Sequence, residues 1–148
     1  MKSFHKNKKG FTLLELVVVL AVISLIIGFL LPHFKGVQDE GNIAKAKGEL
    51  RTLQSAVESY YVHNSNTYPA ALSDLNTATP SIVTSTPTDP LGSSAYGYVR
   101  GGTNNKYYVI YSVGPGGNGS ATITSNAVVE TNGSSCIYVS NVGQDATP

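Results

Sequence analysis

The chain has 148 residues, enough for one domain with a modest core and one extended element, and a second independent domain would be crowded. Charged residues make up only 13% of it and the formal net charge is +1, so the composition provides no basic surface of the kind that binds nucleic acid. Cys136 is the single cysteine, which excludes an intrachain disulfide and a metal site built on paired thiols.

The N-terminal region differs in composition from the rest of the chain. Its first ten positions contain no acidic residue but four lysines, Lys2, Lys6, Lys8 and Lys9. Residues 11–31 are almost wholly apolar, and as a helix rising about 1.5 Å per residue they would measure roughly 31 Å, one bilayer core. Because basic residues before a span stay in the cytoplasm, we expect the chain after Leu31 to lie outside it.

Two other kinds of N-terminal segment share these features. A secretory signal has an apolar region of about 7 to 15 residues and a cleavage site of small residues, and the sequence Leu30-Leu31-Pro32-His33 fits neither. The second is a plain one-span membrane anchor, which the length and charge of the segment do not exclude. A finer feature has to decide between them.

A second helical pattern follows the apolar run, over residues 32–66. Apolar residues recur at spacings of 3 and 4, which predicts an amphipathic helix with one narrow apolar stripe: Ile43, Ala46, Leu50, Leu53, Val57 and Tyr60. We expect this helix to end near residues 63–66. Four residues that loosen helices favour a bend or a melted stretch between the two halves, namely Gly28, Pro32, Gly36 and Gly41.

Residues 67–148 are predicted to form a β-rich head. Residues 69–92 are rich in proline, serine and threonine, which indicates a loop with at most one helical turn near residues 71–75. Aromatic and β-branched runs at 96–100 and 106–113 predict a hairpin, and weaker strand signals follow at 121–124, 127–130 and 136–140. A small antiparallel sheet would cover the apolar stripe, and most of the tyrosines are expected in that core. The predicted class is α+β.

Glu15 decides the functional class. It lies at the fifth position of the apolar run, where an unpaired carboxylate costs on the order of several kcal/mol. One interpretation is that the side chain extends toward the membrane interface. The other is that the carboxylate of Glu15 is paired with a positive charge.

The sequence Lys8-Lys9-Gly10-Phe11-Thr12-Leu13-Leu14-Glu15-Leu16, followed by the apolar run and Pro32, resembles the prepilin signature of type IV pilins and type II secretion pseudopilins. The resemblance implies a pilin-like fold, a leader of residues 1–10, cleavage by a prepilin peptidase between Gly10 and Phe11, and methylation of the Phe11 amine. The carboxylate of Glu15 would then compensate the Phe11 amine of a neighbouring subunit in an apolar filament core, so that Phe11, Glu15 and Pro32 are the expected assembly residues.

The same resemblance implies the location and the partners. The precursor would be a single-pass inner-membrane protein, and the assembled filament would be periplasmic or extracellular. The expected partners are further copies of the chain, the prepilin peptidase, the inner-membrane assembly platform, and minor pilins or pseudopilins. Catalysis is not expected, since no nucleophile, base and orienting group are found together.

The head favours one kind of filament. The sequences Asn66-Thr67-Tyr68-Pro69 and Asp89-Pro90-Leu91-Gly92 are similar to those of the major pseudopilin of type II secretion. A type IV pilin for adhesion, motility or DNA uptake is the first alternative, although the lone Cys136 cannot form the disulfide that many such pilins have. A monomeric single-span membrane protein with a binding head is the second alternative.

The resemblance also raises the question of calcium, because major pseudopilins usually carry an acidic calcium-binding loop after the corresponding strand. Residues 114–120 contain no carboxylate here, and calcium prefers several oxygen ligands that include acids. Only Asn118 and the distant Asp145 suggest themselves as side-chain ligands. A glycine-rich turn without a cofactor is therefore favoured over a calcium site.

Overall fold

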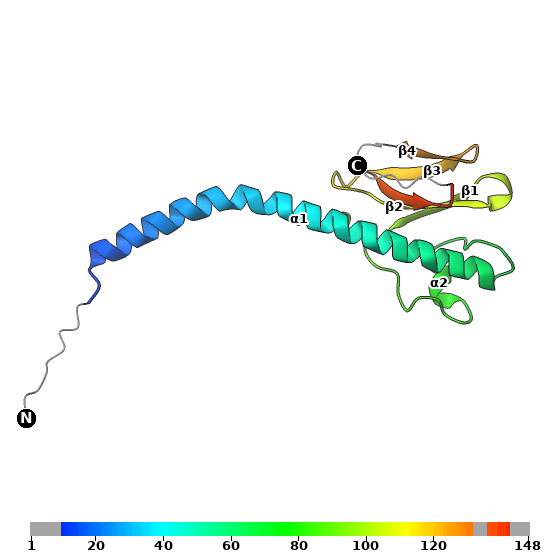
Figure 1. Cartoon of the computed structure of the whole chain (residues 1–148), viewed down its shortest axis with the longest axis horizontal. Coiled ribbons are helices and arrows are strands. Elements are labelled where there is room, and N and C mark those ends of the chain that lie inside the picture. The colour runs from blue at the N-terminus through cyan, green and yellow to red at the C-terminus, as the bar shows by residue number, and fades with distance from the viewer. Residues whose placement is uncertain (1–9, 132–135, 143–148) are drawn as a thin grey trace, which may run out of the picture. The chain divides into compact units, whose positions relative to one another are not determined.

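The structure, a computed structural model, describes residues 10–131 and 136–142. Its elements in chain order are α1 (Leu13–His63), α2 (Asp74–Thr77), β1 (Gly97–Gly101), the 3-10 turn η1 (Thr103–Asn105), β2 (Tyr107–Ser112), β3 (Ser120–Thr124), β4 (Ala127–Thr131) and β5 (Ile137–Ser140) (Figure 1). The order of one long helix followed by short antiparallel strands confirms the predicted α+β class.

The chain divides into two compact units, with the boundary between Gln38 and Asp39. The first unit contains the N-terminal part of α1, and the second contains the C-terminal part of α1 and all of the strands. The second unit is called the head below. α1 is helical without interruption through Gly28, Pro32, Gly36 and Gly41, so the melted stretch considered there does not occur. A proline removes only one backbone donor, and the helical bonds on either side of it can persist.

The apolar stripe predicted from the sequence forms the inner face of α1 in the head. Ala46, Leu50, Leu53 and Val57 are buried, and Ile43 and Tyr60 pack beside them. They join one cluster with side chains from the loop and from the sheet, including Leu72, Leu75, Tyr108, Ile110, Ile137 and Val139. Removal of this apolar area from water is the main source of stability for the head.

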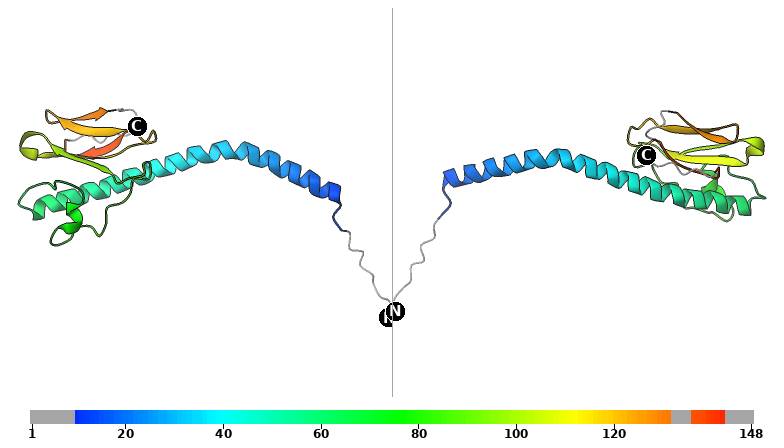
Figure 2. Two further views of the ribbon diagram at one scale, coloured as in Figure 1. Left: turned by 180° about the vertical axis from the view of Figure 1, so that it is seen from behind. Right: turned by 45° about the horizontal axis from the view of Figure 1, so that its top comes forward.

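The strands form two sheets rather than the single sheet that was expected. Strands β1, β2 and β5 make an antiparallel sheet in the order β1-β2-β5, while β3 and β4 pair only with each other. Side chains alternate between the two faces of a strand, so Tyr108 and Ile110 of β2 face α1, while Val109 faces β3. A second cluster of Val109, Ala121, Cys136 and Tyr138 fills the space between the sheets. The head therefore has three layers: α1, the three-stranded sheet, and the β3–β4 hairpin (Figure 2).

The loop between α1 and β1 is tied down by local contacts. The single helical turn expected near residues 71–75 occurs slightly later, as α2, and Asp74 Oδ2 accepts hydrogen bonds from the backbone N–H groups of Ala70 and Ala71. α2 inserts Leu75 into the core. The tyrosines largely behave as expected: Tyr96 and Tyr108 are buried, and Tyr60, Tyr61 and Tyr98 pack against the same cluster.

Candidate assembly site

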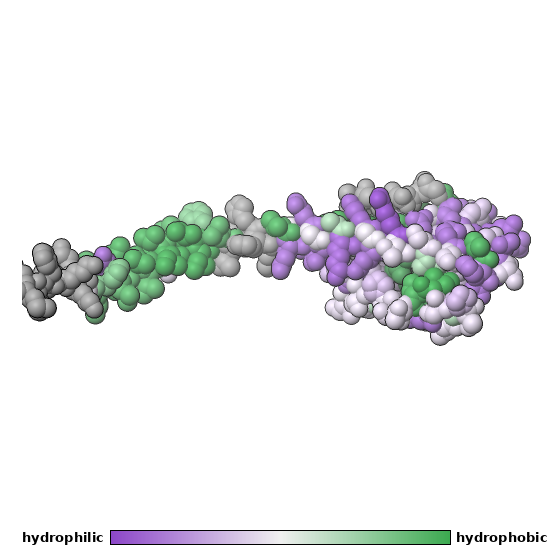
Figure 3. All heavy atoms as spheres, turned by 60° about the horizontal axis from the view of Figure 1, so that its bottom comes forward, coloured by the Kyte–Doolittle hydropathy of each residue, from purple (hydrophilic) through white to green (hydrophobic). Residues whose placement is uncertain are grey.

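The N-terminal part of α1 presents a continuous apolar surface. The segment Leu13–Leu30 has a mean hydropathy of 2.9 and is long and apolar enough to cross a membrane, and none of it is buried within the chain. Its side chains are exposed all around the helix, with Leu13 at 81% and Phe29 at 73% exposure. Figure 3 shows one face of this segment as a run of green, hydrophobic spheres. A surface of this size requires lipid or other apolar helices around it.

Thr12 starts this helix. Its Oγ1 accepts a hydrogen bond from the backbone N–H of Glu15 at 3.2 Å, and its carbonyl oxygen accepts one from the N–H of Leu16, also at 3.2 Å. Thr12 is therefore the N-cap residue, a role not predicted from the sequence, although the Thr-x-x-Glu spacing of Thr12 and Glu15 is a known N-terminal signal. The cap places Glu15 in the first turn, where the helix dipole favours a carboxylate.

Glu15 has no charge partner among residues 10–131 and 136–142. The ion pair found in that part of the chain joins Lys45 to Glu49 at 3.8 Å, on the surface of the head. Phe11 is 80% exposed, and a Cβ atom added to Gly10 would meet nothing within 4 Å. Internal packing thus explains neither the glycine at position 10 nor the carboxylate at position 15. Pro32 lies within α1, of which the structure describes only the backbone there.

The two residues considered for calcium are not brought together by the structure. Asn118 is exposed in the loop between β2 and β3, and Asp145 lies outside the described residues. The loop is closed by its own backbone, since Gly117 N–H donates to Gly114 O and Gly119 N–H donates to Val113 O, each at 2.9 Å. Across the described part of the chain there is no group of three or more His, Cys, Asp or Glu side chains able to hold a metal ion.

Asp89 has a structural role in the head that the sequence did not reveal. Its buried carboxylate accepts hydrogen bonds from the hydroxyl of Ser112 at 2.9 Å, the N–H of Val113 at 2.9 Å and the N–H of Leu91 at 3.0 Å. Three residues later, a Cβ atom at Gly92 would lie 2.9 Å from Val113 Cγ2. The Asp89-Pro90-Leu91-Gly92 turn therefore anchors the end of β2 to the preceding loop.

Comparison with known families accounts for most of the chain. Residues 5–31 match the prokaryotic N-terminal methylation motif, and residues 34–131 match the family described as type II secretion system (T2SS), protein G. No solved structure matches the chain significantly. The two family matches agree with the prepilin signature around Gly10 and with the pseudopilin-like sequence of the head.

Individual relatives also come from type II secretion systems and type IV pili. The chain is 26% identical over 122 residues to a type II secretion system core protein G of Dickeya chrysanthemi, covering 82% of this chain and 78% of the relative. It is 31% identical over 97 residues to that of Pectobacterium carotovorum subsp. carotovorum, covering 64% and 58%. A type IV major pilin protein PilA of Myxococcus xanthus is 33% identical over 61 residues, covering 41% and 28%. The chain belongs to the type II secretion system protein G family, which consists of structural pseudopilin subunits.

Proposed function

We propose that this chain is the major pseudopilin of a type II secretion system, a structural subunit without catalytic activity that polymerises through the N-terminal part of α1. In this proposal a prepilin peptidase removes residues 1–10 and methylates the Phe11 amine. The precursor is an inner-membrane protein with its head outside the cytoplasm. The mature subunits assemble on an inner-membrane platform, together with minor pseudopilins, into a periplasmic filament.

The observation that carries the proposal is that an apolar helix segment, none of it buried within the chain, has a carboxylate in its first turn. Cleavage before Phe11 would create a positively charged amine within a few residues of Glu15. In an apolar filament core, an amine and a carboxylate from neighbouring subunits would compensate each other, while either charge left alone would be costly. This requirement favours one axial offset between subunits over all others.

Shearing of filaments from cells tests the role of Glu15. We expect sheared material from the wild type to contain a chain that starts at methylated Phe11, by intact mass and N-terminal sequence, and we expect the Glu15→Ala variant to yield none. Glu40→Ala is the matched control, because Glu40 is also an exposed carboxylate on α1 but lies beyond the apolar segment. A cleaved or uncleaved monomer whose behaviour is indifferent to Glu15 would refute the assembly model.

Gly10 is tested separately from assembly. Since a side chain at this position meets nothing within 4 Å, a Gly10→Val variant keeps its fold, and any loss of processing reflects recognition by the peptidase. We expect this variant to retain the mass of the full precursor in the membrane fraction. Normal cleavage of Gly10→Val would contradict the proposed processing site.

A type IV pilin is the second candidate, favoured by the similarity to the pilin PilA over the N-terminal part of the chain. The two kinds of filament share the N-terminal chemistry, so residue substitutions there do not separate them. Deletion of the gene does: a pseudopilin deletion blocks release of secreted proteins, and a pilin deletion removes surface filaments. A monomeric one-span membrane protein would show neither effect.

We further propose that the head folds without bound calcium. The support comes from the chemistry of residues 114–120, which offer no carboxylate, and from the two backbone hydrogen bonds that already close this loop. We expect calcium and a chelator to leave the melting temperature of the detergent-solubilised chain unchanged. A rise in melting temperature with calcium that Asn118→Ala or Asp145→Asn abolishes would contradict this proposal.

A further inference from the structure

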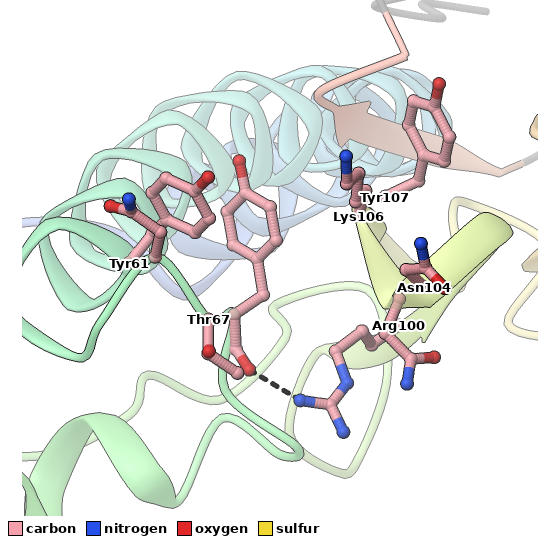
Figure 4. A pocket seen from close by; sticks show the side chains of 9 residues that line it. Tyr61, Thr67, Arg100, Asn104, Lys106 and Tyr107 are labelled. Atoms are coloured by element: carbon pink, nitrogen blue, oxygen red, sulfur yellow. Dashed lines mark hydrogen bonds between the residues drawn. The ribbon is translucent and has the colours of Figure 1, made fainter.

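A pocket of about 500 Å³ opens in the head between the C-terminal end of α1 and the β1–β2 hairpin (Figure 4). One wall comes from Tyr61 and the loop residues 66–68, and the other comes from Arg100 and residues 104–107. The volume falls within the range of sites that bind small molecules. The pocket lies wholly within the head and has no part in the proposed assembly through α1.

The charged residues that line the pocket are both cations, Arg100 and Lys106, and no carboxylate lines it. Neither cation forms an ion pair within the described residues. Two carboxylates of adjoining elements are already engaged: Glu58 accepts hydrogen bonds from the hydroxyls of Tyr108 and Tyr68, and Asp74 accepts those of the Ala70 and Ala71 backbone. The pocket therefore attracts an anion.

Arg100 is held in a fixed position that leaves donors free. Its Nη1 donates a hydrogen bond to the carbonyl oxygen of Tyr68 at 2.6 Å, the dashed line in Figure 4, and its side chain is half-buried. The carbonyl orients the guanidinium but does not neutralise it. Arginine has five N–H donors in a planar fork whose geometry matches a carboxylate, so a ligand carboxylate fits the remaining donors.

Three asparagines add neutral polar groups around the two cations. Asn66, Asn104 and Asn105 have φ angles of 55°, 58° and 54°, a left-handed conformation that asparagine tolerates better than most residues. Their side-chain amides make no hydrogen bond to any other described residue. Each amide can both donate and accept, which matches the hydroxyl groups of a sugar, and Thr67 contributes a further hydroxyl.

Aromatic rings complete the lining. Tyr61 stacks on Tyr68 with ring centroids 4.4 Å apart, and Tyr107 lies on the opposite wall. Rigid rings of this kind give a ligand apolar contact while their hydroxyls reach water or a polar group. We propose that the pocket binds an acidic sugar, a pyranose ring that carries a carboxylate for Arg100 and Lys106 and hydroxyl groups for the asparagine amides.

Calorimetric titration of the full chain in detergent micelles tests this proposal. The probes are a uronic-acid trisaccharide and the neutral trisaccharide in which hydroxymethyl groups replace the carboxylates. We expect the acidic probe to bind and the neutral one to bind at least about tenfold more weakly, because hydrogen bonds to charged groups are the stronger ones. A trimer of glutamate, which carries carboxylates without sugar hydroxyls, is expected to bind weakly as well.

Matched variants locate the binding. Arg100→Gln and Lys106→Gln are expected to lower the affinity for the acidic probe at least about fivefold, whereas Arg51→Gln and Lys45→Gln remove the same charges from the exposed surface of α1 and leave it unchanged. Asn104→Gly keeps the left-handed backbone, removes only the amide, and is also expected to weaken binding. Lys106 is exposed, so its variant keeps the fold even if Arg100→Gln does not.

Three results would overturn the proposal. The first is no heat of binding with the acidic trisaccharide at millimolar concentration. The second is equal binding of the neutral trisaccharide or of the glutamate trimer, which would remove the acidic sugar as the ligand. The third is that Lys45→Gln lowers the affinity for the acidic probe as much as Lys106→Gln does. The loss of affinity would then come from the lower net charge of the chain and not from the pocket.

Discussion

At the scale of single residues, two carboxylates of the head, the half-buried Glu58 and the buried Asp89, join segments that are far apart in the sequence. Glu58 on α1 accepts a hydrogen bond from the hydroxyl of Tyr108 on β2 at 2.7 Å, and Asp89 in the loop holds the end of the same strand. A carboxylate that is removed from water, fully as in Asp89 or in part as in Glu58, is stable only when such donors surround it. These two residues therefore fix β2 against the helix on one side and against the loop on the other.

We expect Asp89→Asn to destabilise the head by about 2–3 kcal/mol, because an amide has one acceptor oxygen for three donors and its NH₂ group would face an N–H or a hydroxyl. Thermal unfolding of the full chain in detergent micelles, followed by circular dichroism, measures the change. Asp39→Asn removes an exposed carboxylate and serves as the control. Equal melting temperatures for the two variants would show that the Asp89 contacts contribute nothing.

At the scale of elements, the β1–β2 pair depends on one glycine. Gly97 lies opposite Tyr111 in the antiparallel register, and a Cβ atom at Gly97 would overlap the Tyr111 ring. The ring thus occupies the space that a side chain at position 97 would need. Glycine weakens an isolated strand. At position 97, however, it permits the aromatic packing between the two sheets.

Two glycine substitutions are therefore expected to act in opposite directions. Gly97→Ala forces the Tyr111 ring out of place and should lower stability by at least about 1–3 kcal/mol, as overpacking of a core does. Gly48→Ala, on an exposed turn of α1 with nothing within 4 Å, should raise it by about 0.5–1 kcal/mol through helix propensity. The same unfolding measurement checks both, and a stabilising Gly97→Ala would contradict the packing described.

At the scale of the whole molecule, tyrosines make the stability of the head sensitive to alkaline pH. Burial, aided by hydrogen bonds to Glu49 and Glu58, raises the pKa of Tyr96 and Tyr108 far above the usual value of 10.0, and burial also raises the pKa of Tyr98. Below pH 10 these phenols are protonated in both the folded and the unfolded chain. Above it only the unfolded chain ionises, so the stability falls.

We expect the melting temperature of the full chain to decline steadily above about pH 10, with tyrosinate absorbance from these residues appearing only as the head unfolds. Tyr108→Phe removes one ionising group and should make the decline shallower. If the melting temperature of Tyr108→Phe falls with pH as steeply as that of the wild type, Tyr108 is not a source of the alkaline sensitivity.

Much of the fold could be predicted because its signals are local. The helical spacing of the residues from Ile43 to Tyr60 identified the face of α1 that is buried, and the aromatic and β-branched runs at 96–100 and 106–113 identified the hairpin. The partition into two sheets could not be predicted, since strand signals do not say which strands share hydrogen bonds over long sequence distances. In the sequence, Asp89 stands out only as part of a segment similar to the major pseudopilin, because its donors on Leu91, Ser112 and Val113 meet through folding.

The sequence by itself determined the family and the membrane-length apolar segment, and it supplied the hypothesis that Gly10, Phe11 and Glu15 act in processing and assembly, because these features depend on the order and spacing of adjacent residues. Tertiary structure alone decided what surrounds each side chain of the head. Arg100 and Lys106 come to line one pocket, and Glu58 and Asp89 come to hold β2 by hydrogen bonds, only when helix, loop and hairpin are brought together. The physical reason is that burial and hydrogen bonding depend on neighbours in space, and the linear chain does not specify those neighbours one residue at a time.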